Sequence, residues 1–223
     1  MSDERNYKIS ILGDSISTYE GYLPYGYPAY YREDVNYDNG LESVDDTWWM
    51  QVINALGVLC VNNSFSGSFV AGNSPACASS DERCSALHGE STPELILIYM
   101  GTNDRGLGLE IGAEKPLERY FFYGAYRLML QKIKKNYPAA KIVCATLPAG
   151  RDREGRYSEY DVYNEKDSRY DEAIRAAVKE ENCLLADLAA FKERYDTRDL
   201  LHPDRNGHKL LASLWLKELS ALL

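Results

Sequence analysis

Five short apolar runs recur along the chain, and most of the segments between them have the periodicity of amphipathic helices. Runs of this length are typical of strands buried on both faces, and their alternation with helices is typical of a parallel sheet covered on both sides. We therefore expect an α/β protein with a central five-stranded parallel sheet. The predicted strands are residues 8–12, 58–62, 95–100, 141–146 and 183–187.

Four helices are predicted between and after these strands. The clearest covers 116–136, because a proline opens it at a permitted first-turn position and lysines close it before Pro138. A shorter one over 46–56 begins with an Asp-Thr pair suited to capping. Two more are expected over 166–181 and from Arg205 to the C-terminus. Their apolar stripes are accounted for by core packing.

Size and charge narrow the class of protein. A chain of 223 residues with 45% hydrophobic content can bury a full core, and we expect one domain over 1–223. The net charge of −9 and the lack of a basic cluster disfavour nucleic acid and anionic membrane surfaces as partners. The polar start, Met1 to Ser10, has no signal-peptide core, which indicates a cytoplasmic protein unless a signal sequence has been removed.

The cysteines indicate reduced thiols and no metal site. Their number, five, is odd, and they are spread over predicted strands and loops. Cys77 and Cys84 are close enough in sequence to pair in an oxidising compartment, so that alternative stays open. No Cys-His spacing resembles a zinc site, and we expect no metal or organic cofactor.

Two segments lack the hydrophobic periodicity of a helix or a strand. The first is an insertion at about 19–45, which is rich in Tyr, Pro, Gly and Asp. Long segments of this kind in compact domains are usually functional loops or disordered, and aromatic content favours order. The second segment, 150–164, carries arginines and further tyrosines. The seven tyrosines of the first segment are Tyr19, Tyr22, Tyr25, Tyr27, Tyr30, Tyr31 and Tyr37.

A candidate nucleophile and its partners lie at opposite ends of the chain. The first strand ends in Gly-Asp-Ser, which places Ser15 at the carboxyl edge of the sheet, where α/β proteins bind ligands. Near the other end, Asp199 and His202 are three residues apart. A serine hydroxyl needs a neutral histidine to accept its proton, and usually an anion to orient that histidine. Taken singly, the first motif also suits a polar strand-to-loop turn, and the second suits a helix cap at Asp204 with an incidental histidine.

Two further strands end in residues that suit an oxyanion hole. Asn103 follows the third strand, and its side-chain amide is able to donate to a negatively charged oxygen. Gly67 follows the second strand, and a glycine there lets the backbone N–H come close to a ligand. Each of the two residues also has a plain interpretation as a turn former.

Together these pieces resemble the SGNH (GDSL-type) hydrolases, whose four sequence blocks carry Ser, Gly, Asn and His in that order. The blocks correspond here to Gly13–Ser15, Asn62–Gly67, Gly101–Asp104 and Asp199–His202, and they frame residues 7 to about 215. The resemblance implies a three-layer αβα sandwich of the flavodoxin-like type. The first block departs from the family by continuing as Ile-Ser-Thr before the tyrosine-rich insertion.

The resemblance also implies roles for the block residues. Ser15 would attack an ester carbonyl, His202 would take and return the proton, and Asp199 would orient His202. The backbone N–H groups of Ser15 and Gly67 and the side chain of Asn103 would form the oxyanion hole. No cofactor is implied.

The ester itself is less defined by the sequence. The tyrosine-rich insertion favours a short-acyl or carbohydrate ester, because aromatic faces with polar tips suit sugar rings. The alternatives are a lysophospholipase or thioesterase, and a carbohydrate-binding relative without turnover. Candidate substrate contacts are Tyr19, Tyr22, Trp48 and Arg105, and Arg151, Arg153 and Arg156 are candidates to meet an anionic substrate or to form surface ion pairs. The oligomeric state is left open.

Overall fold

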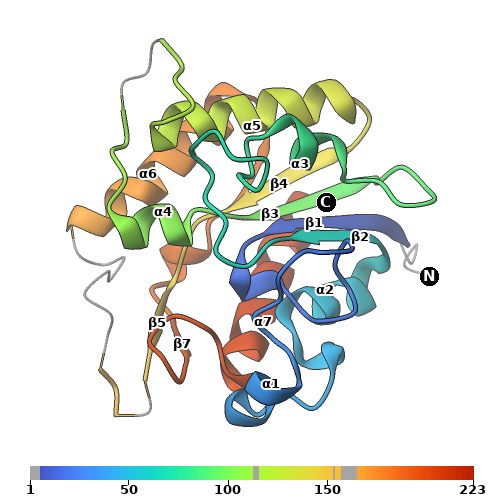
Figure 1. Cartoon of the computed structure of the whole chain (residues 1–223), viewed down its shortest axis with the longest axis vertical. Coiled ribbons are helices and arrows are strands. Elements are labelled where there is room, and N and C mark those ends of the chain that lie inside the picture. The colour runs from blue at the N-terminus through green and yellow to red at the C-terminus, as the bar shows by residue number, and fades with distance from the viewer. Residues whose placement is uncertain (1–5, 113–115, 153, 157–164) are drawn as a thin grey trace.

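A computed structural model of the chain describes residues 6–112, 116–152, 154–156 and 165–223 (Figure 1). Its centre is a parallel five-stranded sheet in the order β2-β1-β3-β4-β6. The strands are β1 (Tyr7–Gly13), β2 (Gly57–Ser64), β3 (Leu95–Tyr99), β4 (Lys141–Ala145) and β6 (Leu184–Ala186). All five residues of β3 are buried, as expected for the middle strand of a sheet covered on both faces.

Helices cover both faces of this sheet, which makes three layers (Figure 1). On one face lie α3 (Asp81–Ser85), α5 (Phe122–Asn136) and α6 (Glu165–Glu180), and on the other lie α2 (Trp48–Leu56) and α7 (Arg205–Leu222). The strand order is the flavodoxin-like 2-1-3-4-5, with β6 in the fifth place. The predicted fold class, with its five parallel strands and three layers, is therefore confirmed.

The tryptophans pack the core between α2, α7 and the sheet. Trp48, Trp49 and Trp215 are fully buried, and the rings of Trp48 and Trp215 stack with centroids 5.1 Å apart. The Trp48 indole N–H donates to the Ser17 hydroxyl at 3.3 Å. The prediction of Trp48 as a substrate contact is wrong, because its helix turns the indole inward to pack against α7.

Helix α5 begins at Phe122, six residues after the predicted start at Pro116. The N–H groups of Phe122 and Tyr123, which open the helix, donate to the carbonyls of Glu110 and Ile111 at 3.0 Å. The first N–H groups of a helix have no acceptor within the helix, and these tertiary bonds satisfy two of them. The helix therefore starts where the bonds form. The other predicted helices agree with α2, α6 and α7 to within two residues.

Several short elements were not predicted. They are the helix α1 (Glu33–Asn39) inside the tyrosine-rich insertion, α4 (Thr102–Leu107), the 3-10 turns η1 (Ser15–Ser17), η2 (Val44–Asp46) and η3 (Leu188–Phe191), and the strands β5 (Ala149–Arg151) and β7 (Arg194–Asp196). The two strands pair in parallel as a small second sheet, on the side of the molecule toward which β1 and β3 run (Figure 1). β7 leads directly into the loop that holds Asp199 and His202.

The cysteines are free thiols, which answers the alternative left open for Cys77 and Cys84. Both side chains are buried, and their sulfurs donate to the carbonyls of Ala71 and Ala78 respectively. Across the described residues, no helix has both the length and the apolar character needed to cross a membrane.

Candidate active site

Ser15 lies at the point where the strand order reverses, just after β1 and beside the carboxyl end of β3. It opens the turn η1, whose preceding residue Asp14 accepts the N–H of Ile16 at 3.1 Å. A side chain at Gly13 would come within 2.5 Å of Ser17 Oγ, so only glycine lets the strand turn this tightly. The turn thus presents Ser15 at the edge where open α/β sheets bind ligands.

His202 meets Ser15 although 187 positions separate them in the chain. The Nε2 atom of His202 lies 2.9 Å from Ser15 Oγ, and its Nδ1 atom lies 2.6 Å from Asp199 Oδ2. The hydroxyl, the imidazole and the carboxylate therefore form one continuous hydrogen-bonded chain. The three residues predicted from the first and last sequence blocks come together in the structure.

The loop that carries Asp199 and His202 is closed on itself. Thr197 and Pro203 form an antiparallel bridge, and the N–H of Leu200 donates to Thr197 Oγ1 at 2.9 Å. Leu200 has a φ of +68°, a left-handed conformation that costs a non-glycine residue roughly 1 to 2 kcal/mol. This tight turn returns the Asp199 carboxylate to the imidazole three residues further on.

The electrostatics of Asp199 favour its ionised form. Burial by itself raises the pKa of Asp199, but the hydrogen bond and the electrostatic interaction with His202, with further bonds from backbone N–H groups, bring it well below its usual range. Those backbone donors are Leu201 at 3.0 Å and His202 at 2.7 Å, both to Oδ1. An ionised carboxylate in this position keeps a proton on the Nδ1 atom of His202 and leaves Nε2 free to accept one.

The predicted oxyanion residues surround the same strand edge. Gly67 is exposed with a φ of +79°, and its N–H and that of Ser15 have no hydrogen-bond partner within the described parts of the chain. Asn103 donates one side-chain N–H to Ser68 O at 2.8 Å. This bond holds its amide against the loop of residues 65–71, called the Gly67 loop, and leaves the second amide hydrogen unused. The three groups are thus available as donors to an oxyanion.

The Asp104 side chain holds the Gly67 loop in place. Its carboxylate is fully buried and accepts the N–H groups of Val70 and Ala71 at 2.8 and 3.0 Å. Burial raises the pKa of Asp104 to about 6, against the opposing effect of these two bonds. The Asp104 carboxylate therefore acts as a cap on this loop.

Arg83 is a buried arginine that the sequence analysis missed. It lies in α3, between two acidic residues and a cysteine, where the sequence pattern resembles a charged surface helix. Its side chain is nevertheless fully buried and bonds the turn of Ser15, the end of β2 and the Gly67 loop together. The acceptors are the carbonyls of Gly13, Asn63 and Ala76, the amide oxygen of Asn63 and the hydroxyl of Ser68, at 2.6 to 3.0 Å.

Tyr30 is the second residue that the sequence analysis did not place at the site. Its ring stacks on the ring of His202 with centroids 3.4 Å apart and an angle of 11° between the planes. Its hydroxyl donates to Asp199 Oδ2 at 3.0 Å. The composition of residues 19–45 indicated a functional loop, but nothing in it distinguished Tyr30 from the other six tyrosines.

The remaining predicted contacts do not gather at Ser15. Arg105 is 5% exposed and donates to Leu147 O at 2.8 Å, so its prediction as a substrate contact is wrong. Tyr19 packs edge-on against Tyr22, and Tyr22 lies against Trp49. Tyr19 lines a separate surface hollow with Glu20, Gly21, Arg32, Glu33, Asn36, Leu41 and Glu42.

The arginines of the second segment form surface ion pairs where they are described. Arg151 pairs with Asp196 and Arg156 pairs with Asp152. Arg153 and the stretch 157–164 lie outside the described residues.

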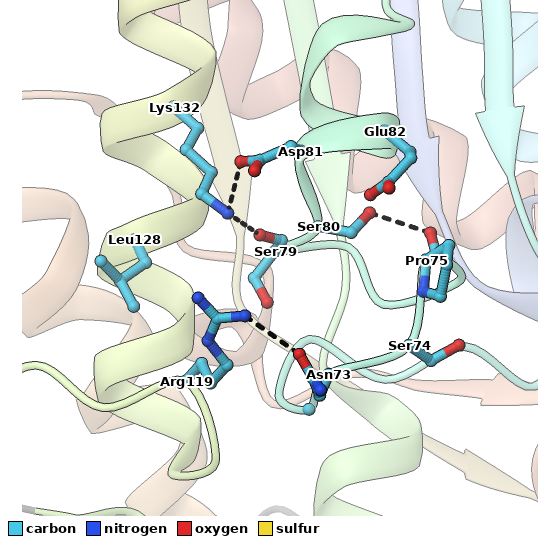
Figure 2. A pocket seen from close by; sticks show the side chains of 11 residues that line it. Asn73, Ser74, Pro75, Ser79, Ser80, Asp81, Glu82, Arg119, Leu128 and Lys132 are labelled. Atoms are coloured by element: carbon cyan, nitrogen blue, oxygen red, sulfur yellow. Dashed lines mark hydrogen bonds and ion pairs between the residues drawn. The ribbon is translucent and has the colours of Figure 1, made fainter.

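A second hollow, of about 210 Å³, lies between the 72–82 loop and α5 and shares no residue with the Ser15 site (Figure 2). Lys132 donates to Ser79 O and pairs with Asp81, and Arg119 donates to Asn73 (Figure 2). These bonds fasten the loop to α5 and to the segment that precedes it. Among the described residues, no group of three or more His, Cys, Asp or Glu side chains is arranged to hold a metal ion.

The fold and the site together define an α/β protein with a Ser-His-Asp arrangement at the switch point of its sheet. Residues 7–148 match the family model described as GDSL-like Lipase/Acylhydrolase. The chain belongs to this family, whose model describes lipases and acylhydrolases.

Solved structures and a curated relative agree with this assignment. Crystal structures of GDSL-like lipases from Bacteroides ovatus and Bacteroides uniformis are 26% identical, with TM-scores of 0.73 and 0.74. Each match covers 97% of this chain, and it covers 99% of the Bacteroides ovatus protein and 96% of the Bacteroides uniformis protein. A multidomain esterase of Ruminococcus flavefaciens is 25% identical over 138 residues, which span 59% of this chain but only 16% of the esterase.

Proposed function

We propose that the protein is a serine esterase that hydrolyses carboxylic esters through an acyl-serine intermediate. The observation that carries the proposal is the hydrogen-bonded chain from Ser15 Oγ through His202 to Asp199, at 2.9 and 2.6 Å. Ser15 Oγ attacks the acyl carbon while its proton passes to His202 Nε2. Asp199 stabilises the imidazolium that results, because its low pKa keeps it ionised.

The negative oxygen of the tetrahedral intermediate is bound by the N–H groups of Ser15 and Gly67 and by the free amide hydrogen of Asn103. Collapse of the intermediate breaks the ester C–O bond, and His202 returns the proton to the leaving alkoxide. Water then attacks the acyl-serine with His202 as base, which releases the acid and restores Ser15. The two half-reactions use the same donors.

For the substrate we propose a short-acyl or carbohydrate ester, with acetyl as the acyl group. Tyrosines of the 19–45 insertion border the site: Tyr27 packs on Phe65 with ring centroids 5.0 Å apart, and Pro28 O accepts the N–H of Ser66. Phe65 and Ser66 directly precede Gly67. Rings that carry hydroxyls suit a sugar or another small polar alcohol better than a long acyl chain.

Labelling with a fluorophosphonate tests the mechanism. We expect the wild-type protein to form a stoichiometric adduct on Ser15, located by peptide mass spectrometry, and Ser15→Ala to form none. Lack of reaction in the folded wild-type protein would contradict the proposal and favour a binding protein without turnover.

A chain-length series of p-nitrophenyl esters, with acetylated sugars and lysolipids beside it, tests the substrate. We expect kcat/KM to be highest for acetate and to fall for octanoate and longer chains. A preference for long chains or lysolipids would instead support the lysophospholipase or thioesterase alternative.

Asn103→Ala tests the oxyanion role. Losing one well-aimed donor is expected to lower kcat by about 10²- to 10³-fold with little change in KM, since the donor acts mainly on the transition state. Steady-state kinetics with p-nitrophenyl acetate measure this, and Asn54→Ala on the exposed side of α2 is the control. Full activity of Asn103→Ala would show that this amide does not bind the oxyanion.

A further inference from the structure

Tyr30 touches both partners of the nucleophile at once. Its ring covers one face of the His202 imidazole, nearly parallel at a centroid distance of 3.4 Å. Its hydroxyl donates to Asp199 Oδ2, the same oxygen that lies 2.6 Å from His202 Nδ1. One side chain therefore limits both the tilt of the imidazole and the position of the carboxylate that orients it.

We propose that Tyr30 is a positioning residue, which holds His202 in line with Ser15 and stabilises the imidazolium formed during acyl transfer. The inference rests on the proposed esterase function and adds to it a residue outside the four sequence blocks. Tyr30 acts through His202 rather than through the reacting atoms. The insertion 19–45 thereby contributes to the chemistry of the site, in addition to forming its rim.

The backbone of Tyr30 is tied to the turn of the nucleophile. Its N–H donates to Thr18 Oγ1 at 2.9 Å, and Thr18 Oγ1 donates to Ser15 O at 2.8 Å. The ring of Tyr30 also packs edge-on against Tyr31, which is fully buried and donates to Pro203 O. Tyr30 is thus fixed to the element that carries Ser15 and to the loop that carries His202.

The phenol of Tyr30 remains a donor throughout the neutral range. Burial, together with the charge and the hydrogen bond of Asp199, raises the pKa of Tyr30 to about 12. A protonated hydroxyl gives Asp199 a donor besides His202 and the two backbone N–H groups. The carboxylate is therefore held from several directions and does not rotate away from the imidazole.

The stacked geometry favours the charged form of His202. Two neutral rings placed face to face gain little, because their negative faces meet. An imidazolium over the face of a tyrosine is attracted to it as a cation. Because His202 takes the proton of Ser15 during the attack, the contact is stronger in the transition state than in the ground state, which is the condition for raising kcat.

Two substitutions separate the ring from the hydroxyl. Tyr30→Leu removes both, and we expect kcat for p-nitrophenyl acetate to fall about tenfold or more, the scale of a desolvated cation–π contact, with KM within twofold of wild type. The second-order rate of fluorophosphonate labelling should fall by the same factor. Tyr30→Phe keeps the stack, and its kcat should stay within about threefold of wild type, the scale of one hydrogen bond. Tyr120→Leu, an exposed tyrosine outside the insertion, is the matched control.

The results that would overturn the inference are distinct. If Tyr30→Leu keeps its fold and its wild-type kcat and labelling rate, Tyr30 has no positioning role. If KM rises while kcat and the labelling rate stay constant, Tyr30 is a substrate contact instead. If Tyr30→Leu lowers Tm, Tyr30→Met fills the space without a π face and repeats the test. If the wild-type protein neither reacts with fluorophosphonate nor turns over esters, it is the proposed function that fails.

Discussion

Ser15→Ala and His202→Ala are each expected to lower kcat by about 10⁴- to 10⁶-fold, and the double variant is expected to be no worse than either alone. The two side chains act as one unit across a 2.9 Å hydrogen bond, so removing either partner abolishes attack by the serine alkoxide. The residual rate reflects the oxyanion donors and substrate binding. Steady-state kinetics with an activated acetyl ester measure the effect.

Two variants serve as controls for these losses. Ser213→Ala and His88→Ala alter an exposed serine and an exposed histidine that have no contact with Ser15, and both should retain wild-type kcat. Circular dichroism should show an unchanged fold in all four single variants. If Ser15→Ala kept more than a few per cent of wild-type kcat, the nucleophile would have to be sought elsewhere.

Arg83→Met is expected to lower the free energy of unfolding by about 3 to 5 kcal/mol, the scale of breaking a buried charged network. The substitution leaves five acceptors without this donor, in the Ser15 turn, the end of β2, the Gly67 loop and the 72–82 loop. Burial lowers the pKa of Arg83 to about 10, which still leaves the guanidinium charged at neutral pH. Because the same bonds hold the Gly67 loop, kcat should fall as well.

Chemical denaturation measures the change in stability, and two comparisons define its cause. Arg83→Lys should retain only part of the free energy of unfolding that Arg83→Met loses, since an ammonium cannot reproduce the planar fork of a guanidinium. Arg32→Met removes an exposed ion pair with Asp34 and should stay within about 1 kcal/mol of wild type. Equal losses at the two arginines would show that burial and the fork geometry of Arg83 contribute nothing special.

Much of the fold could be predicted from the sequence because its signals are local. Apolar runs such as 95–100 must be buried on both faces, and the intervening helical periods require layers on either side of the sheet. Since parallel strands end at one edge, Ser15 and Asn103 were expected at the same edge of the sheet, and the structure makes β1 and β3 neighbours there. The closeness of Asp199 and His202 follows in the same way from their spacing of three residues.

The positions that were mispredicted or missed depend on contacts between distant segments. Nothing within a few residues of Trp48 or Arg105 reports that the final fold buries them, and so both looked available to a substrate. Arg83 finds acceptors up to 70 positions away, and Tyr30 meets Asp199 across 169 positions. Helix α5 starts late for the same reason, since its first donors are taken by Glu110 and Ile111.

By itself, the sequence determined the layered α/β architecture and predicted the candidate Ser-His-Asp set, because the hydrophobic period is a local property and short sequence blocks carry the resemblance to the family. Only the tertiary structure decided which of the seven tyrosines in 19–45 lies on His202 and which buried cation holds the Gly67 loop. The physical reason is that both choices depend on how chain segments far apart in sequence pack against one another, and packing leaves no periodic trace in the sequence.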